Sequence, residues 1–470
     1  MSDLPDLSAT ELRRRIGARD VTVAEAVEAC LDRVADRNPE LNAVVTLNRR
    51  VLEDAKQLDR RIDRGEDPGL LCGLTVGIKD VTPVGGLRTT YGSPIYADHI
   101  AAEDALVVRR LRGAGAVILG KTNCPEFAAG ANTFNEVFGR TRNPWDPSRS
   151  AGGSTGGGAA GLATGMIALA EGTDLGGSLR IPAAFCGIVG LRPSVGLVPT
   201  HPTDWVWDTL QVTGPMARTA EDVALMLQAI AGPSEHSPFA QPVDGRDFVR
   251  GMNTGRQNLR LAYCADVAGI GIDPDVERVC RDAAFALRDS GLHVEEIELD
   301  LSIARQAFLP LRGLWFVTQM FPRLEMQDRF GPNVGNNVRS GLKVATQELA
   351  AAENYRSRLW HQFRELFTRF DHLLTPCVAV PPFSVEQNYP DSIAGKPMKT
   401  YIDWIAPTFV LSLTGLPVAS VPAGLDDGGL PVGLQIAGRM RDEEGVLALA
   451  AAIQKVRPMR LPQSSERRSA

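Results

Sequence analysis

Two serines of this chain stand in backbone that is unusually rich in glycine. Ser154 and Ser178 each follow a Gly-Gly pair within residues 152–193. Glycine weakens helices and strands, so such crowding indicates backbone with positive φ, or N–H groups that another group approaches closely. A flexible Gly/Ser linker is the alternative, but apolar segments follow the glycines here, and linkers lack them. Both serines are therefore candidate nucleophiles.

The residues around Ser178 predict a junction between a strand and a helix. Residues 166–170 (MIALA) are typical of a short buried strand, and residues 180–182 favour a helix start with Pro182 near its first position. Backbone N–H groups at such a junction are unpaired and can converge on a developing oxyanion. The candidates for this oxyanion hole are the N–H groups of Leu175, Gly176, Gly177 and Ser178.

A serine hydroxyl needs a base within hydrogen-bond reach to act as a nucleophile at neutral pH. None of the histidines stands in a glycine-rich motif, and each is more typical of a surface or structural residue. The six are His99, His201, His236, His293, His361 and His372. Lys79 ends the apolar run 74–78, which predicts a buried strand. Desolvation there lowers the pKa of an ammonium group, so Lys79 is the alternative base.

Longer blocks of sequence give these residues a context. The blocks are GLTVGIKD (73–80), GKTNCPEF (120–127), GGSTGGG (152–158), GTDLGGSLRIPAAFCGIVGLRPS (172–194) and GLPVGLQIAGR (429–439). Together they resemble the amidase signature family, from the N-terminal helices to the last of these blocks. The resemblance implies an α/β fold in one large domain, with a central mixed β-sheet covered by helices on both faces. It also implies catalysis without a metal or a cofactor.

The resemblance further implies a Ser–cisSer–Lys triad. Ser178 is then the nucleophile, Ser154 the bridging serine on a cis peptide bond after Gly153, and Lys79 the base. Neutral Lys79 accepts a proton from Ser154, and Ser154 accepts one from Ser178, which attacks the carbonyl carbon. The reverse relay protonates the leaving amine, and a water molecule then repeats the cycle on the acyl-enzyme.

Four neighbouring residues either match or depart from the family pattern. Asp174 and Arg180 match positions that brace the loop of the nucleophile, with an ordinary surface ion pair as the alternative. Thr155 stands where a second serine is usual, and Gly158 stands where the glycine run normally ends in serine. Neither departure affects the triad, but local hydrogen bonding is expected to differ.

The implied activity is hydrolysis of C–N bonds in amides, aryl amides or carbamates, the last as in urethanases. One alternative within the family is the glutamine-hydrolysing component of the tRNA-dependent amidotransferase, its A subunit, which releases ammonia from glutamine and holds the glutamine amine with an acid. Here residues 405–408 (IAPT) occupy that place, and Asp403 is two residues out of register. A non-catalytic scaffold is a third possibility, which replacement of Lys79, Ser154 or Ser178 would favour; all three are present.

Four residues are candidates for the substrate pocket. Trp205 and Trp207 lie in a polar-flanked WVW segment after the signature, where this family shapes its pocket, although paired aromatics are otherwise typical of a core. The resemblance also puts Cys124 and Phe127 in a segment that borders the site.

Three shorter motifs point to other functions. Residues 115–122 match the Walker-A pattern, but their variable positions AVIL are themselves a predicted strand. Residues 152–156 match the GxSxG nucleophile elbow, yet a polar loop precedes them instead of a strand. Residues 340–343 match SxxK without an SDN or KTG triplet. The sequence around each motif therefore disfavours nucleotide hydrolysis and the penicillin-binding class, and gives only weak support to an α/β-hydrolase.

Composition limits the partners. The 470 residues are 44% hydrophobic and carry a net charge of −6, which indicates a globular protein without a nucleic-acid surface. The N-terminus lacks an apolar signal segment and prolines interrupt the uncharged stretch 405–425, so we expect a cytoplasmic protein that does not enter a membrane.

Seven scattered cysteines without CxxC spacing predict neither disulfides nor a zinc site. The expected partner is a small-molecule amide or carbamate, bound by a monomer or homodimer.

The order of expected elements divides the single domain 1–470 into four parts. They are the N-terminal helices (1–65), the signature core (66–231), a smaller α/β and helical region (232–370) and a return to the core sheet (371–470). Capping boxes at Ser8–Glu11 and Thr22–Glu25 open the first helices. Breaks at 322–323 and 330–336 interrupt the later helices, and 320–340 is a candidate mobile lid, with a surface loop as the alternative.

Overall fold

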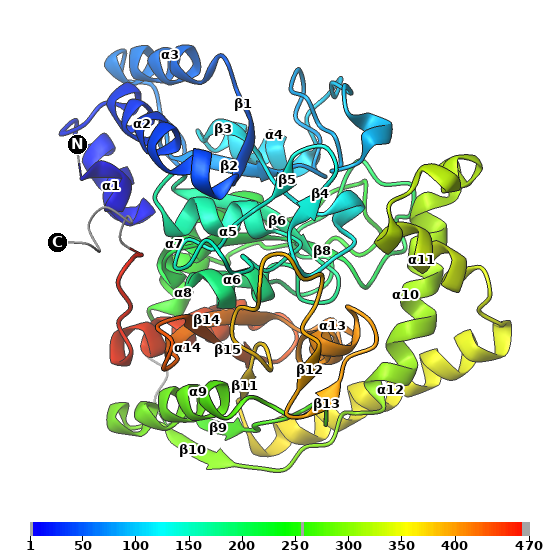
Figure 1. Ribbon diagram of the computed structural model, residues 1–470. Coiled ribbons are helices and arrows are strands. Elements are labelled where there is room, and N and C mark those ends of the chain that lie inside the picture. Colours follow the sequence, from blue (N-terminus) through cyan, green and yellow to red (C-terminus); the bar gives the residue numbers. More distant parts are fainter. Residues whose placement is uncertain (1–2, 255–257, 463–470) are drawn as a thin grey trace.

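Eleven strands form one sheet in the computed structural model, which describes residues 3–254 and 258–462 (Figure 1). In spatial order they are β1 (Val44–Leu47), β3 (Val117–Thr122), β2 (Thr75–Lys79), β6 (Leu169–Asp174), β8 (Val212–Ala217), β7 (Val189–Arg192), β14 (Val418–Leu425), β15 (Pro431–Ala437), β11 (His372–Pro376), β9 (Arg260–Tyr263) and β10 (His293–Glu296). The sheet is mixed, since β3, β2 and β6 run parallel whereas β6, β8, β7, β14 and β15 pair antiparallel. Two short hairpins stand apart, β4 (Phe134–Asn135) with β5 (Gly139–Arg140) and β12 (Ser392–Ile393) with β13 (Lys396–Pro397).

Helices cover both faces of this sheet. The α-helices are α1 (Ala9–Gly17), α2 (Val23–Leu41), α3 (Val51–Asp63), α4 (Leu106–Gly113), α5 (Gly156–Ala163), α6 (Arg180–Cys186), α7 (Ala220–Ile230), α8 (Phe248–Met252), α9 (Pro274–Ala286), α10 (Ala304–Met320), α11 (Pro332–Gly341), α12 (Thr346–Arg369), α13 (Ala406–Ser412) and α14 (Glu443–Val456). On one face α5 and α6 pack together, and on the other α7 packs with α8 and α14. The predicted α/β domain with a mixed sheet covered on both faces is confirmed.

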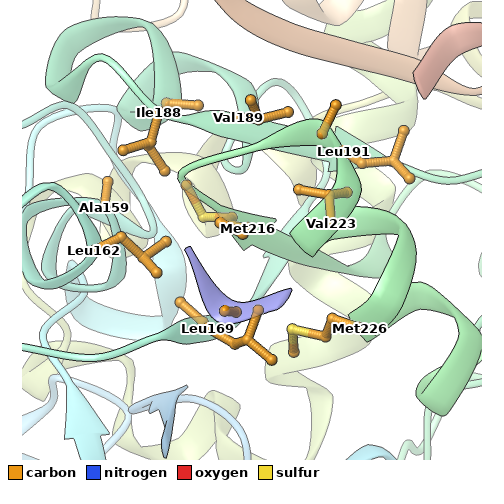
Figure 2. Packing of buried hydrophobic residues seen from close by; sticks show 14 of the residues in the cluster. Ala159, Leu162, Leu169, Ile188, Val189, Leu191, Met216, Val223 and Met226 are labelled. Atoms are coloured by element: carbon orange, nitrogen blue, oxygen red, sulfur yellow. The ribbon is translucent and has the colours of Figure 1, made fainter. Parts of the chain in front are cut away.

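The core between these layers is built from aliphatic side chains. Leu162 of α5 and Leu169 of β6 pack near Met216 of β8 and Met226 of α7 (Figure 2), and all four are fully buried. A second cluster gathers α6, α10, α12 and α13, with Phe308 stacked on Phe409 at a ring distance of 4.2 Å. Burial of apolar surface contributes roughly 25 cal/mol per Å² and so stabilises both clusters.

Two neighbouring parallel strands bring their carboxyl ends to the same edge of the sheet. β2 pairs with β6, and Ile78 lies opposite Glu171. Lys79, the last residue of β2, therefore lies near the end of β6, which extends three residues beyond Glu171 to Asp174. Ligand sites of open α/β sheets lie at such edges.

Several local expectations need adjustment. The strand expected over 166–170 begins at Leu169, because the chain first turns at Gly165, where φ is +74°. The break expected over 330–336 is a helix from Pro332 onward, since proline is favoured in the first turn of a helix. At α1, Glu11 bonds with Arg14 and Arg15, so only Thr22–Glu25 forms a complete capping box.

No helix in the described part of the chain is long and apolar enough to cross a membrane. The uncharged stretch 405–425 contains α13 and all of β14, which are buried except for the last two residues of β14.

Candidate active site

Lys79 is fully buried at the end of β2. Its Nζ donates to Ser154 Oγ at 2.7 Å and to Thr173 Oγ1 at 3.0 Å. Burial lowers the pKa of Lys79 to about 8, because desolvation outweighs the attraction of nearby acidic groups such as Glu171. Near neutral pH the neutral fraction of this amine is therefore far larger than that of an exposed lysine, and its lone pair can accept a proton.

Ser154 lies immediately ahead of α5, after a cis peptide bond from Gly153. Its side chain is fully buried and accepts the hydrogen bond from Lys79. A Cβ at Gly153 would lie 3.0 Å from the carbonyl carbon of Ala131, so the close approach of these two segments requires glycine at this position. Ser154 is thus in direct contact with the lysine at the sheet edge.

Ser178 lies in the turn between β6 and α6 and is partly exposed. It lines a cavity of about 40 Å³ together with Ser154 and Gly176. Thr155 N donates to Ser178 O at 3.3 Å, which ties the two serine loops together. The hydroxyl of Ser178 has no hydrogen-bond partner among the described residues, so it is free to approach a ligand in this cavity.

The four N–H groups expected to bind an oxyanion are not equivalent. The N–H of Gly177 donates to Asp174 Oδ1 at 2.8 Å and is therefore already engaged. Those of Leu175, Gly176 and Ser178 have no acceptor within the described residues, and all three residues line the 40 Å³ cavity. Three donors thus remain for a developing negative charge.

Asp174 and Arg180 form a fully buried, bidentate ion pair, unlike a surface pair. Arg180 Nε and Nη2 each donate to the Asp174 carboxylate at 3.0 Å, and Arg192 approaches it at 3.4 Å. Burial alone would raise the pKa of Asp174, but the two guanidinium groups outweigh it and hold the pKa well below its usual range. The charged carboxylate also accepts from the N–H groups of Gly177 and Leu179, and so fixes the turn that carries the nucleophile.

The two departures from the family pattern lie side by side. A Cβ at Gly158 would lie 3.1 Å from Cγ2 of Thr155. A serine at position 158 would therefore crowd the methyl group of Thr155, which would have to shift by a few tenths of an ångström. Thr155 Oγ1 and Thr122 Oγ1 are both buried and have no hydrogen-bond partner among the described residues.

A second buried lysine and its acidic neighbours, which were not predicted from the sequence, lie near Lys79. Lys121 of β3 donates to Thr82 O, and its Nζ lies 3.7 Å from Asp80 Oδ1. Glu171 accepts from Lys79 N at 3.2 Å and from Thr82 Oγ1 at 3.0 Å. Side chains alternate between the two faces of a strand, so Glu171 and Thr173, which accepts from Lys79, lie on the same face of β6. This alternation is the signal from which Glu171 could have been predicted at the site.

Lys121 belongs to the strand itself, so the Walker-A match is not a phosphate loop.

A larger cavity of about 370 Å³ lies next to the small one. Four residues line both spaces: Ala128, Thr173, Gln211 and Trp315. Trp205 and Phe127, both pocket candidates, lie on the wall of the larger cavity. The aromatic-walled space therefore lies next to the cavity that the two serines line.

The other two pocket candidates lie elsewhere. Cys124 is fully buried and lines neither of these two cavities, and burial raises its pKa to about 12, so the thiol stays protonated. The Trp207 side chain is 64% exposed and packs edge-on against Phe239. All seven cysteines are buried.

Two histidines reach the wall of the larger cavity. His201 and His236 stack with ring centroids 3.9 Å apart. Neither histidine forms a hydrogen bond with Ser154 or Ser178 in the described structure. They therefore line the cavity without contacting the two serines through hydrogen bonds. The described residues hold no cluster of three or more His, Cys, Asp or Glu that could bind a metal ion.

The segment 320–340 reaches the larger cavity with its first residues. Met320 and Arg323 line it, and Arg323 Nε donates to Tyr96 OH at 2.6 Å. Gly331 N donates to Glu126 Oε2 at 2.8 Å. The first residues of the candidate lid thus form part of the cavity wall.

Known proteins with similar sequences include enzymes of two kinds. An acylamidase of Rhodococcus erythropolis is 35% identical over 96% of this chain and 96% of its own. The A subunit of the glutamyl-tRNA(Gln) amidotransferase of Carboxydothermus hydrogenoformans is 36% identical over 96% of this chain and 97% of its own.

Solved structures agree with this grouping. A bacterial aryl acylamidase of the amidase signature family superposes with a TM-score of 0.90 and 29% identity, covering 96% of each chain. A 6-aminohexanoate cyclic dimer hydrolase superposes with a TM-score of 0.86 and 26% identity, covering 98% of this chain and 99% of its own. The family model for amidases matches residues 25–447. The buried lysine, the two serine loops and these matches together show that the chain belongs to the amidase signature family.

Proposed function

We propose that this protein is a serine hydrolase that cleaves C–N bonds of amides, aryl amides or carbamates through an acyl-enzyme. The observation that carries this proposal is the 2.7 Å hydrogen bond between Lys79 Nζ and Ser154 Oγ. Ser154 also lines the small cavity that Ser178 lines. Lys79 acts as the base, Ser154 transfers the proton, and Ser178 is the nucleophile. The protein acts as a monomer or homodimer.

The reaction follows from the groups at the sheet edge. Substrate brings Ser178 Oγ and Ser154 Oγ into hydrogen-bond contact, since such contacts often tighten only in the complex. Ser178 Oγ attacks the carbonyl carbon, its proton passes to Ser154 Oγ, and the proton of Ser154 passes to Lys79. Collapse of the tetrahedral intermediate breaks the C–N bond, and the relay returns one proton to the leaving nitrogen. Water then attacks the ester by the same relay, which releases the acid and frees Ser178.

The N–H groups of Leu175, Gly176 and Ser178 stabilise the oxyanion of both intermediates. Donors that are fixed before the reaction cost no reorganisation in the transition state, and one such donor contributes roughly 10²–10³ in kcat. Asp174 with Arg180 keeps these donors in place, because it engages the intervening N–H of Gly177.

A glutamine-hydrolysing component of an amidotransferase is the runner-up, and one observation disfavours it. The carboxylate of Asp403 accepts from Thr400 N at 2.8 Å and pairs with Arg305 at 2.7 Å. It lines neither of the two cavities described above, so it is not available to a glutamine amine. A screen of short aliphatic amides, anilides, aryl carbamates and glutamine tests the proposal. A preference for glutamine would favour the glutamine-hydrolysing component instead. Absence of all hydrolysis would refute the proposal.

The pH profile follows from the pKa of Lys79. Because the base must be neutral and burial sets its pKa to about 8, kcat/KM should rise tenfold per pH unit below that value and level off above it. The measurement is kcat/KM between about pH 5.5 and 9.5 for a neutral amide, whose own ionisation does not contribute. A profile that is flat from about pH 6 to 9 would contradict a lysine base.

Trp205 should set a preference for apolar leaving groups. Contact with about 50 Å² of apolar surface, at ~25 cal/mol per Å², corresponds to about tenfold in kcat/KM for an anilide over a small amide. Trp205→Ala should remove most of this preference. Trp207→Ala is the matched control, because its side chain faces solvent and should leave the preference unchanged. Equal effects of the two substitutions, or none, would show that the aromatic wall does not select the substrate.

A further inference from the structure

A buried guanidinium lines the small cavity beside the serines. Arg312 comes from the middle of α10, and its side chain is only 5% exposed. It lines the 40 Å³ cavity together with Ser154, Ser178 and Tyr401. Arginine is always charged in proteins, so this cavity carries a fixed positive charge.

The contacts of Arg312 leave this charge unpaired. Its Nη1 donates to Asn337 Oδ1 and its Nη2 to Tyr401 OH, which are both neutral groups. The guanidinium also lies over the rings of Phe316 at 4.5 Å and Tyr401 at 5.2 Å. Among the described residues no carboxylate lies within 4.0 Å of it. Burial of a charge without a counter-ion is costly, and a ligand that supplies the counter-ion recovers that cost.

Tyr401 adds a second donor at the same wall. Its hydroxyl oxygen accepts from Arg312 and, at 2.7 Å, from Asn337 Nδ2. The proton of this hydroxyl has no acceptor within the described part of the chain, and Tyr401 lines the small cavity. Arg312 keeps unused N–H donors as well, because the guanidinium has five in all. Asn337 is itself held by the carbonyl of Asn333 at 2.6 Å, so the cluster is fixed before any ligand enters.

The size of the cavity limits what these donors can bind. A volume of about 40 Å³ has room for a few heavy atoms, about the size of a carboxylate on a short chain. The 370 Å³ cavity is left for the leaving group. We propose that Arg312 and Tyr401 bind a carboxylate at the far end of the acyl group, so that the preferred substrates are amides of short dicarboxylic acids. This inference rests on the proposed hydrolase function.

The test compares charged and neutral acyl groups. The charged substrates are the anilides of malonic, succinic and glutaric half-acids, and the neutral ones are butyranilide and the anilide of 4-oxopentanoic acid. We expect kcat/KM for the best half-acid to exceed both neutral substrates at least tenfold, since a hydrogen bond to a charged group is worth a factor of roughly 10 to 100. Arg312→Met should abolish that advantage mainly through KM. Arg312→Lys should keep part of it.

Arg305→Met is the matched control, because it removes one positive charge from an exposed side chain of the same helix. It should leave the advantage in place. Equal loss in both variants, or an Arg312→Met variant that keeps the charged preference, would overturn the proposal and leave Arg312 with a structural role. A binding experiment tests the carboxylate site even if no amide is hydrolysed. Calorimetry measures how tightly the three half-acid anilides bind to Ser178→Ala protein, with and without the additional substitution Arg312→Met. If no amide is hydrolysed, the proposed function fails. A tenfold or greater loss of binding on Arg312→Met would still support the carboxylate site.

Discussion

Replacing Ser178 by alanine is expected to lower kcat by up to roughly 10⁶, because it removes the atom that forms the acyl-enzyme. The hydroxyl of Ser178 has no hydrogen-bond partner among the described residues, so the free energy of unfolding should stay within about 0.5 kcal/mol of its original value. The measurements are single-substrate kinetics on an anilide and a thermal melt of the same preparation.

Ser148→Ala is a suitable control for this loss. Ser148 is an exposed serine in the loop ahead of Ser154, and among the described residues its side chain bonds only with Asp146. Its replacement should leave kcat unchanged. A Ser178→Ala enzyme that retains more than about one hundredth of the original kcat would contradict a nucleophilic role.

Replacing Lys79 by methionine should lower kcat by at least roughly 10³, in line with the loss of a general base. Methionine matches the length and apolar stem of lysine, so the substitution removes the amine without opening a large cavity in the fully buried end of β2. It also removes the rise of kcat/KM through pH 8, the pKa of the buried amine. The pH profile of the residual activity therefore reports on the same group by an independent route.

The histidines on the cavity wall supply the competing hypothesis for the base. His201→Asn and His236→Asn should each retain kcat within about tenfold, because neither ring bonds with a serine of the site. If either histidine variant loses activity while Lys79→Met keeps it, the base has been assigned to the wrong residue.

The sequence predicted those parts of the site that depend on local backbone. Lys79 at the end of an apolar run is the end of β2, and the turn before Arg180 lies between β6 and α6 as expected. Asp174 could be predicted beside Arg180 from the family pattern, although its full burial could not. Glycine spacing and strand alternation act over a few residues, and such short-range patterns are legible in a sequence.

The parts that the sequence did not predict depend on contacts between distant segments. Arg312 and Tyr401 are 89 residues apart and meet only because α10 packs beside the loop ahead of α13. Trp205 and Trp207 stand in one loop with the same neighbours in sequence, and only the packing of that loop turns one inward and the other to solvent. The N–H of Gly177 was expected to face the substrate, but the nearby Asp174 carboxylate engages it.

The central claim is that Lys79 and Ser154 activate Ser178 as the nucleophile. A fluorophosphonate probe tests it most directly, because the probe forms a stable phosphonyl ester with an activated serine. Intact-mass and peptide mass spectra should show a single adduct on Ser178, formed at a rate that falls sharply in Lys79→Met and Ser154→Ala proteins. An adduct on Ser154 or on any other residue, or labelling of Ser178 at an undiminished rate in the Lys79→Met protein, would contradict the account.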